Sequence, residues 1–308
     1  MRSLLLWVSE NEWCRETLPS FGFVKKAVRR FMPGEGLEDA LREAARLNAE
    51  QGIPSLITFL GENVADQAEA RAVADHYIDA IRTISDRGLE TEISLKPTHL
   101  GLDLGAEVAY ENVLRVTEAA QEADTWVWLD MEYSRYVDPT LELYQAVRAK
   151  HANFGICLQS YLHRTPTDVE ALIPLGAAIR LVKGAYAEAP EIAFPAKRDV
   201  DEAFFDLAVR LLRADSRAAG VRTGLATHDE NLIRRITEWA RGEGVSDDAY
   251  EFQMLYGIAT TEQRRLVESG SHVRILISYG SHWFPWYVRR LAERPANVGF
   301  VVKSMLPG

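Results

Sequence analysis

Two hydrophobic patterns alternate along the chain. Short runs of β-branched and other apolar residues are each followed by a longer stretch in which apolar residues recur every three or four positions. The first pattern is typical of buried strands and the second of amphipathic helices, so their alternation predicts βα units around a parallel sheet. The expected strands are residues 54–60, 90–96, 125–130, 153–159, 177–183, 222–227, 250–256 and 272–278.

A helix is expected after each of these strands. Apolar residues share one face of 66–87, where Gly88 predicts the end, and similar spacing predicts helices over about 105–122 and 138–150. Thr260 and Gln263 have the spacing of a capping box, which predicts that they open the seventh helix. The other expected helices are a short one after Pro166, one around 204–212, one around 232–240, and a last one within 283–293.

Eight βα units predict a single α/β domain with the (β/α)8 TIM-like barrel architecture. A doubly wound sheet is the alternative, but no expected strand is followed by the Gly-x-Gly-x-x-Gly turn of a dinucleotide fold. Residues 1–50 are expected to add N-terminal helices, including one that begins near Leu37. Residues 51–298 would form the barrel, with the final helix over its mouth, and 299–308 a C-terminal tail.

Charge and cysteine content narrow the function classes. The chain has 35 Lys and Arg against 45 Asp and Glu, a net charge of −10, which disfavours nucleic acid and anionic membranes as main partners and favours a small substrate. Cys14 and Cys157 are too few for a disulfide framework, and Cys157 is expected to be a buried thiol in a cytoplasmic protein. The sequence contains no signal-peptide pattern and no apolar run of about 18 residues.

Polar residues close the expected strands, at the barrel end where active sites of this architecture lie. Buried cations there need anionic partners, which a small carboxylate or a phosphorylated cofactor would supply. For each residue taken singly, ordinary solvation of a loop is the alternative explanation. The candidates are Glu62, Lys96, Asp130, Gln159, Arg180, Lys183, His228 and Gln253, with Arg289, Arg290 and Glu293 on the last helix.

The last expected helix has a face of its own. Trp286, Arg289, Arg290 and Glu293 follow i, i+3, i+4, i+7 spacing, so they share one side of the helix. Because a guanidinium binds a carboxylate through two parallel hydrogen bonds, this face indicates a carboxylate clamp. Ion pairs of the two arginines with Glu293 on a solvated helix are the alternative.

Other chemistries have less support in the sequence. There is no Gly-x-Ser-x-Gly elbow and no Cys–His signature, and the seven His residues are scattered without metal-ligand spacing. We therefore expect no metal, and His228 with Asp229 is typical of a helix start. Lys183 leaves a Schiff-base lysine open, whereas the following Gly184 indicates close approach of a ligand to the backbone.

Seven segments of the chain form a recognisable set of motifs. They are FLGENV from Phe59, SLKPTHLG from Ser94, WLDMEYS from Trp128, RLVKGAY from Arg180, ATHDENL from Ala226, EFQMLYG from Glu251 and WYVRRLAERPANV from Trp286. Together they resemble the short monofunctional bacterial form of the proline dehydrogenase family, and the similarity covers about residues 30–302. The resemblance implies a distorted (β/α)8 barrel that holds non-covalent FAD, with proline stacked on the flavin and a hydride passing from the proline ring to flavin N5.

The resemblance also implies residue roles. Substrate head-group binders are matched by Lys96, Arg289, Arg290 and Glu293, with Asp130 in the same pocket and Tyr186 and Leu255 as its walls. FAD contacts are matched by Gln159, Arg180, Val182, Lys183, Gly184, Thr227, His228, Gln253 and Arg290, with Arg180 near N5. Glu62 matches the partner of Arg289 in an ion pair that closes over the substrate.

Two pocket positions differ from the family pattern. Trp286 and Leu276 stand where the family has tyrosines that wall the proline ring. The replacements keep apolar surface but remove two hydroxyl donors, so the carboxylate clamp is expected to persist while ring specificity changes. Tyr279 or Tyr287 could compensate through a local shift.

The expected function is FAD-dependent oxidation of L-proline to 1-pyrroline-5-carboxylate in proline catabolism, with electrons passed to a quinone. A related flavoenzyme that oxidises a modified proline or another cyclic secondary-amine acid is the first alternative. A flavin-free Schiff-base lyase that uses Lys183 and a non-catalytic binder are the others. The expected location is the cytoplasm, and peripheral contact with the inner face of the membrane is left open.

Overall fold

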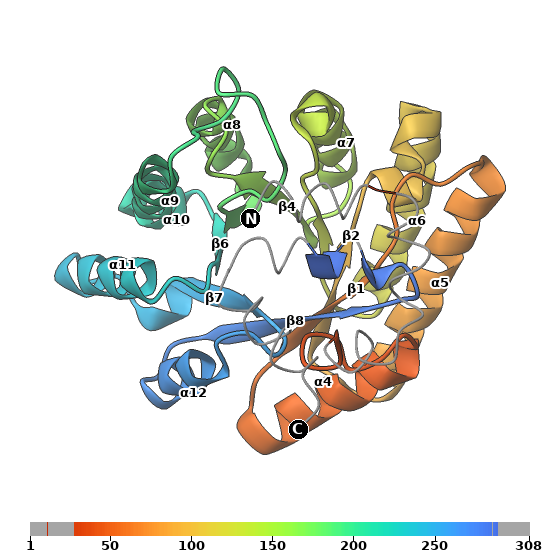
Figure 1. The fold of residues 1–308 in the computed structure, drawn as a ribbon, viewed down its shortest axis with the longest axis horizontal. Helices are drawn as coiled ribbons and strands as arrows, with labels where there is room; N and C mark the ends of the chain where they lie inside the picture. Colours follow the sequence, from red (N-terminus) through yellow and green to blue (C-terminus); the bar gives the residue numbers. More distant parts are fainter. Residues whose placement is uncertain (1–10, 12–27, 285, 289–308) are drawn as a thin grey trace.

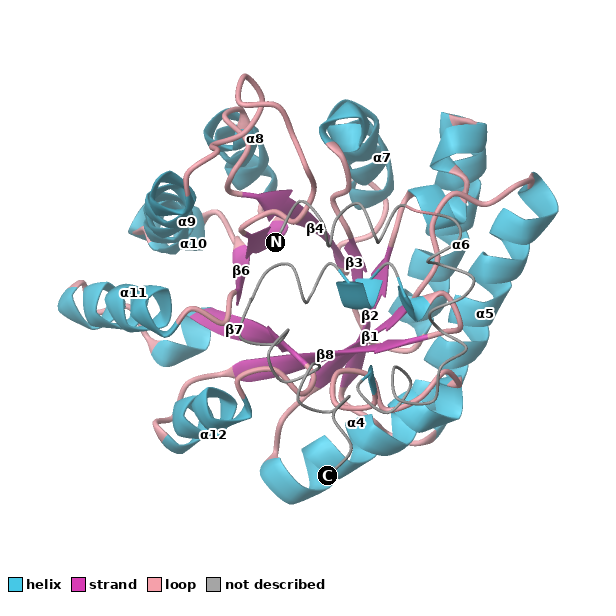
Figure 2. Ribbon diagram, viewed as in Figure 1, coloured by secondary structure: helices cyan, strands magenta, loops and turns pink. Residues whose placement is uncertain are grey.

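The computed structural model describes residue 11, residues 28–284 and residues 286–288. Eight parallel strands, coloured magenta in Figure 2, close into a barrel in the order β1 to β8, and helices surround it (Figures 1 and 2). A closed ring pairs β8 with β1, so it has no free edge strand. The predicted (β/α)8 barrel is confirmed, and the doubly wound sheet is excluded.

All eight predicted strands are present, and each ends within one residue of its expected end. The strands are β1 Ser55–Phe59, β2 Thr91–Leu95, β3 Val127–Leu129, β4 Phe154–Gln159, β5 Ala178–Val182, β6 Arg222–Ala226, β7 Tyr250–Leu255 and β8 Val273–Tyr279. The α-helices are α4 Leu37–Gln51, α5 Gln67–Asp86, α6 Ala106–Glu122, α7 Val137–Arg148, α8 Thr165–Leu172, α9 Lys197–Leu212, α10 Ala214–Ala218, α11 Glu230–Gly242 and α12 Thr260–Glu268.

Most of the helix starts and ends predicted from the sequence are confirmed by the structure. The Asp66 side chain accepts a hydrogen bond from Glu69 N and so caps α5, and Gly88 follows that helix with a φ of 61°. Asp229 caps α11 through Asn231 N, as the sequence predicted for a helix start. The predicted helix before β1 is also present, because α4 packs Leu41 and Ala44 into the core.

The capping box predicted for α12 is wrong. This helix begins after Ala259, which has a left-handed φ of 52° and provides no side-chain cap. Gln263 turns its amide toward the preceding loop and donates hydrogen bonds to the carbonyl oxygens of Leu255 (3.0 Å) and Ile258 (2.8 Å). In the tight turn after β7, Leu255 O also accepts a 3.3 Å hydrogen bond from Ile258 N, and the Gln263 amide completes the bonding of both carbonyls instead of capping the helix start.

Side chains alternate between the inside of the barrel and its wall of helices. The main hydrophobic core lies between strands and helices, and it includes Ile57 of β1 and Tyr77 of α5. Inside the barrel, Leu56, Trp128 and Ala178 form a separate buried cluster, with Leu276 packed against it. The barrel is therefore filled at mid-height, which leaves the strand ends for ligand contacts.

Residues after β8 pack over the carboxyl ends of the strands. Trp283, Phe284 and Trp286 belong to one buried cluster with Leu60, which follows β1, and Ile258, which follows β7. This agrees with the predicted segment over the mouth, although its residues 289–293 lie outside the described residues. None of the described helices combines the length and apolarity needed to span a bilayer.

Candidate active site

Arg180, Asp130 and Ser94 form a hydrogen-bonded group inside the barrel. Arg180 of β5 pairs with Asp130, the residue after β3, and its Nη2 also donates to Ser94 Oγ of β2 at 2.8 Å. Ser94 Oγ in turn donates to Asp130 Oδ1 at 2.9 Å. The sequence predicted that cations at the mouth need anionic partners, and for Arg180 that partner is a carboxylate of the protein itself.

The Arg180 guanidinium is buried, with 3% of the residue exposed, and it lies above the indole ring of Trp128 at 5.6 Å. Burial by itself lowers the pKa of Arg180, but Asp130, Cys157 and Glu92 together outweigh this effect and the pKa is raised. Arg180 therefore carries a fixed positive charge. The neighbouring Cys157 thiol is buried as predicted, and burial raises its pKa, which keeps the thiol neutral.

A second group of contacts links the ends of β2, β3 and β4. The Glu132 carboxylate, 3% exposed as a residue, accepts hydrogen bonds from Thr98 N (3.0 Å) and Thr98 Oγ1 (2.9 Å). Gln159 Nε2 donates to the backbone oxygens of Met131 (2.7 Å) and Glu132 (2.9 Å). Because carbonyl oxygens accept only, they fix the Gln159 amide so that its oxygen is the group left for other contacts.

Lys96 lies half-buried at the end of β2, beside this group. Burial raises the pKa of Glu132, and the Lys96 ammonium acts against that effect. Burial also lowers the pKa of His99 to about 4, with Lys96 as the next cause. The predicted head-group lysine is therefore set among a buried carboxylate and a neutral imidazole.

Gln253 and His228 lie at the ends of β7 and β6. Gln253 Nε2 donates to Glu251 Oε1 at 2.6 Å. His228 Nε2 accepts a hydrogen bond from Leu255 N at 2.8 Å, which makes the Nδ1–H tautomer the neutral form. Thr227 is buried, and its hydroxyl accepts from Asp229 N.

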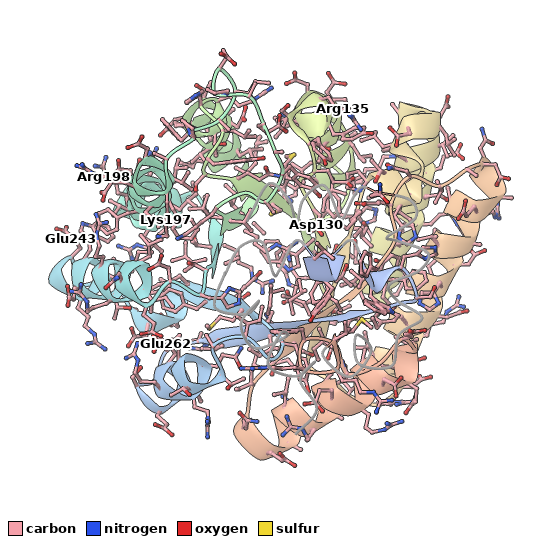
Figure 3. All side chains as sticks on the ribbon, in the orientation of Figure 1. Asp130, Arg135, Lys197, Arg198, Glu243 and Glu262 are labelled. Atoms are coloured by element: carbon pink, nitrogen blue, oxygen red, sulfur yellow. The ribbon has the colours of Figure 1, made fainter. Side chains whose placement is uncertain are left out.

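Lys183, the residue after β5, is held by two carboxylates. Its Nζ donates to Asp201 Oδ1 at 2.6 Å and to Asp229 Oδ2 at 2.9 Å, and Lys197 binds the same two aspartates. Burial raises the pKa of Asp229, but the hydrogen bonds from both lysines outweigh this, so its pKa lies well below the usual value. Figure 3 shows Lys197 on the outer side near α9, away from Asp130 at the centre of the barrel.

The stretch after Lys183 is shaped by tight packing. Gly184 has a φ of 111°, and a Cβ at this position would lie 2.2 Å from Cδ1 of Tyr161. The close neighbour that requires glycine is thus a ring of the protein. Tyr186 is buried and lies against Tyr133, with ring centroids 4.3 Å apart, and Val182 is the half-buried last residue of β5.

The predicted pocket walls fall into two groups. Leu255 packs on the cluster that contains Trp286, whereas Leu276 packs inside the barrel with Trp128. Tyr279 does not compensate for Leu276, because it points to the helix side and its hydroxyl bonds His76 Nε2 at 2.9 Å. Tyr287 is buried, and its hydroxyl has no hydrogen-bond partner among the described residues.

Part of the predicted clamp lies outside the described residues, namely Arg289, Arg290 and Glu293. The predicted gate between Glu62 and Arg289 stays a prediction for the same reason. Glu62 itself is half-buried in the loop after β1.

The sequence reasoning missed residues one layer below the strand ends. Ser94 and Trp128 stand two positions before Lys96 and Asp130, so they share the inward face of the same strands. The period of two along a strand would have identified both. Glu92, Arg222, Glu251 and Arg274 lie deeper still as a charged cluster, in which Glu92 and Arg274 are buried and the other two are half-buried.

Three predicted cofactor contacts carry buried polar atoms that have no hydrogen-bond partner among the described residues. They are Oε1 of Gln159, Nη1 of Arg180 and Oε1 of Gln253. Buried polar groups in proteins are nearly always satisfied, so a site with two acceptors and one donor left over fits a polar ligand. A flavin offers both donors and acceptors to such a site. In the part of the chain that the structure describes, no three His, Cys, Asp or Glu residues are grouped to hold a metal ion.

Comparison with known proteins agrees with this geometry. Residues 40–303 match the family described as "Proline dehydrogenase". "Proline dehydrogenase 1" of Bacillus subtilis subsp. natto is 35% identical over 307 residues, which covers 99% of each chain. "Proline dehydrogenase" of Deinococcus radiodurans is 36% identical over 286 residues, which covers 91% of this chain and 90% of the relative.

A solved structure is similar in fold. The crystal structure of proline utilization A from Bdellovibrio bacteriovorus superposes with a TM-score of 0.83 at 22% identity. The superposition covers 98% of this chain and 39% of that protein, so the chain spans well under half of it. At this identity the similarity supports the barrel fold alone.

Proposed function

The chain belongs to the proline dehydrogenase family, and we propose that it oxidises L-proline to 1-pyrroline-5-carboxylate with FAD bound at the carboxyl ends of the barrel strands. Family membership supports the reaction. The observation that supports the cofactor is the set of unpaired buried atoms on Gln159, Arg180 and Gln253. Bound FAD supplies the hydride acceptor.

The residues at the mouth would place a positive charge near the ligand and bind the substrate carboxylate. Arg180 holds a positive charge in a buried position. Its guanidinium donates hydrogen bonds toward an anionic or acceptor group of any ligand placed over it. Asp130 and Ser94 keep its guanidinium in one orientation. Lys96 provides a cation for the substrate carboxylate, together with Arg289 and Arg290, and Glu293 completes that head-group site.

Other residues would hold the cofactor. Gln159 and Gln253 present acceptor oxygens, and His228 lies beside them at the end of β6, with its Nε2 bonded to Leu255 N. Val182, Lys183, Gly184 and Thr227 line the same strand ends. Tyr186, Leu255 and Trp286 contribute apolar surface, which excludes water from the reacting ring.

Proline must reach the flavin with a neutral amine, because the nitrogen lone pair assists departure of the hydride. Bound FAD would accept the hydride from the ring carbon, and loss of a proton from the nitrogen to solvent would leave the C=N bond of the product. Two electrons then pass to a quinone, a step supported by the family resemblance.

Anaerobic titration tests the proposal. The purified chain should be yellow, with an absorbance band at about 450 nm that bleaches when proline is added. A colourless protein that binds no added FAD would contradict the cofactor assignment. Quinone reduction coupled to proline, with and without lipid vesicles, tests the acceptor.

A second candidate function is oxidation of a modified proline or a related cyclic amino acid. Its support is that Leu276 is apolar, packs with Trp128, and is not compensated by Tyr279. Bleaching by an alkylated proline or pipecolate, in the absence of bleaching by proline, would favour it. The Schiff-base alternative has no such support, because Lys183 Nζ is already bound by Asp201 and Asp229.

A further inference from the structure

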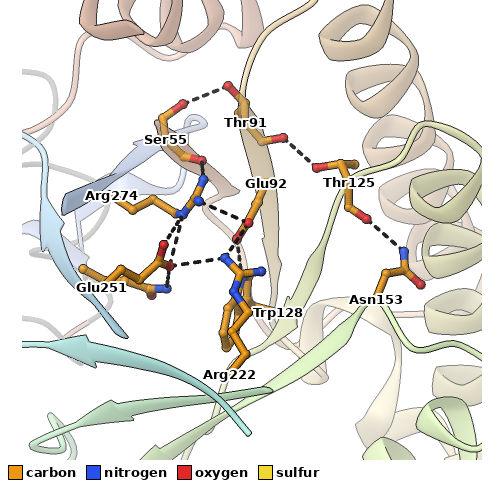
Figure 4. A network of polar contacts seen from close by, with 10 residues as sticks. Ser55, Thr91, Glu92, Thr125, Trp128, Asn153, Arg222, Glu251 and Arg274 are labelled. Atoms are coloured by element: carbon orange, nitrogen blue, oxygen red, sulfur yellow. Dashed lines mark hydrogen bonds and ion pairs between the residues drawn. The ribbon is translucent and has the colours of Figure 1, made fainter. Parts of the chain in front are cut away.

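Four charged residues fill the amino-terminal part of the barrel interior. This barrel-floor cluster consists of Glu92, Arg222, Glu251 and Arg274, shown in Figure 4. Arg222 Nη2 bonds Glu92 Oε1 at 2.7 Å, and Arg274 Nε bonds both oxygens of Glu251 at 3.1 Å. With two carboxylates and two guanidinium groups, the cluster is neutral and its charges are paired.

One member of the cluster contacts the candidate site directly. Glu251 and Gln253 are two positions apart on β7, so both side chains point into the barrel. Glu251 Oε1 accepts a hydrogen bond from Gln253 Nε2 at 2.6 Å. The guanidinium groups of Arg274 and Arg222 also donate to Glu251, so its oxygens act only as acceptors.

This contact decides which way the Gln253 amide faces. An amide has a donor end and an acceptor end, and a carboxylate acceptor selects the donor end. The acceptor end, Gln253 Oε1, is then the atom that is buried without a partner. Gly224 on the neighbouring strand provides the space for this arrangement, since a Cβ there would lie 2.7 Å from Gln253 Nε2.

We propose that Glu251 is a positioning residue for the cofactor: it orients Gln253 so that a hydrogen-bond acceptor faces a donor of the FAD ring or its hydroxylated chain. The inference rests on the proposed function, because the ligand that meets Gln253 is the proposed FAD. It goes beyond it by assigning a role to a half-buried acidic residue of the barrel floor, which would otherwise serve stability alone.

A double-mutant cycle tests this link on the full-length holoprotein. In Glu251→Gln the new amide can donate to Gln253 Oε1, so Gln253 can turn its own donor toward FAD. FAD dissociation is monitored by the recovery of flavin fluorescence on dilution. We expect the Kd for FAD to be about fivefold to tenfold higher in this variant than in the parent. In the Gln253→Ala background the same substitution should change the Kd less than about twofold.

Glu92→Gln is the matched control. It removes the same charge from the same cluster, but the hydrogen bonds and ion pairs of Glu92 join it to Trp128, Arg222 and Arg274 and not to Gln253. Its effect on the Kd should be the same with Gln253 and with Ala at position 253. Equal loosening by Glu251→Gln in both backgrounds would overturn the proposal.

Gly224→Ala probes the link without altering any charge. The added methyl group must displace the Gln253 amide, so this variant should weaken FAD binding to a similar degree and shift the flavin absorption band. This variant also decides the question if Glu251→Gln fails to fold. An unchanged Kd and spectrum in folded Gly224→Ala would overturn the proposal, whereas a parent protein that binds no FAD would refute the proposed function instead.

Discussion

Arg180 and Trp128 are stacked inside the barrel, with the guanidinium carbon of Arg180 5.6 Å from the centroid of the indole ring. On its other edge, the indole Nε1 donates to Glu92 Oε2 at 2.6 Å. Glu92 of the barrel-floor cluster thus holds the Trp128 ring on its amino-terminal side, and the ring supports Arg180, the one described arginine at the predicted reaction centre. Position and charge of Arg180 are fixed before any ligand binds, which is the preorganisation that electrostatic catalysis requires.

Arg180→Met should lower the reduction potential of the bound flavin and slow its reduction by proline. The fixed cation attracts the reduced, more negative flavin, and losing about 1.4 kcal/mol of that attraction lowers a two-electron potential by about 30 mV. Arg180→Lys keeps the charge and should stay closer to the parent. Spectroelectrochemistry and stopped-flow reduction measure both effects. Equal potentials in Arg180→Met and the parent would show that Arg180 lies away from the flavin.

Asp229→Asn should remove a pH-dependent part of the stability. Because the pKa of Asp229 in the folded chain lies below its usual value of 3.8, its ionised form stabilises the fold above that pH, and the contribution is lost as the pH falls toward the folded pKa. Asparagine also caps helices, so the α11 cap should persist. Urea unfolding from pH 7 to pH 3 should show the parent and the variant converging. A difference independent of pH would contradict the prediction.

Gln263→Ala should destabilise the protein by about 1–3 kcal/mol, because the carbonyl oxygens of Leu255 and Ile258 lose the hydrogen bonds from Gln263 Nε2. With an unfolding entropy of about 2.1 cal/mol/K per residue, each kcal/mol lowers the Tm of this 308-residue chain by about 1.5 °C. Thr260→Ala is the control. A capping box would make the two substitutions comparable, whereas the observed contacts predict a shift within about 0.5 kcal/mol for Thr260→Ala.

Ring specificity should follow the apolar walls. A substrate hydroxyl buried against Leu276 forfeits about 1–3 kcal/mol of hydrogen bonding, so hydroxyproline should be discriminated against at least as strongly as in relatives with tyrosines there. Pyrrolidine lacks the carboxylate for Lys96, Arg289 and Arg290 and should be a very poor substrate. Comparison of kcat/KM for proline, hydroxyproline, pipecolate and pyrrolidine checks both statements. Similar values for proline and pyrrolidine would reject the clamp.

Strand positions and the barrel could be predicted because each signal is local. The alternating patterns mark where a strand ends, and the architecture then assigns those ends to the mouth, which placed Arg180, Asp130 and Gln253 on the inner side of the barrel, where the structure has them. Their functional roles stay predictions. Side-chain contacts across the barrel could not be predicted this way. The pairing of Arg180 with Asp130 joins residues 50 positions apart. The contact of Gln263 with the turn after β7 depends on the left-handed backbone conformation of Ala259, which an alanine in the sequence does not predict.

The filled lower half of the barrel has a kinetic consequence. Paired charges and the Trp128 layer occupy the amino-terminal side of the described barrel, so ligands have their approach to Arg180 from the carboxyl side. Proline and the electron acceptor would then enter through one opening and compete for it. Double-reciprocal plots of the initial rate against the proline concentration, recorded at several acceptor concentrations, should accordingly give parallel lines. This is the pattern of an enzyme that releases its first product before the second substrate binds.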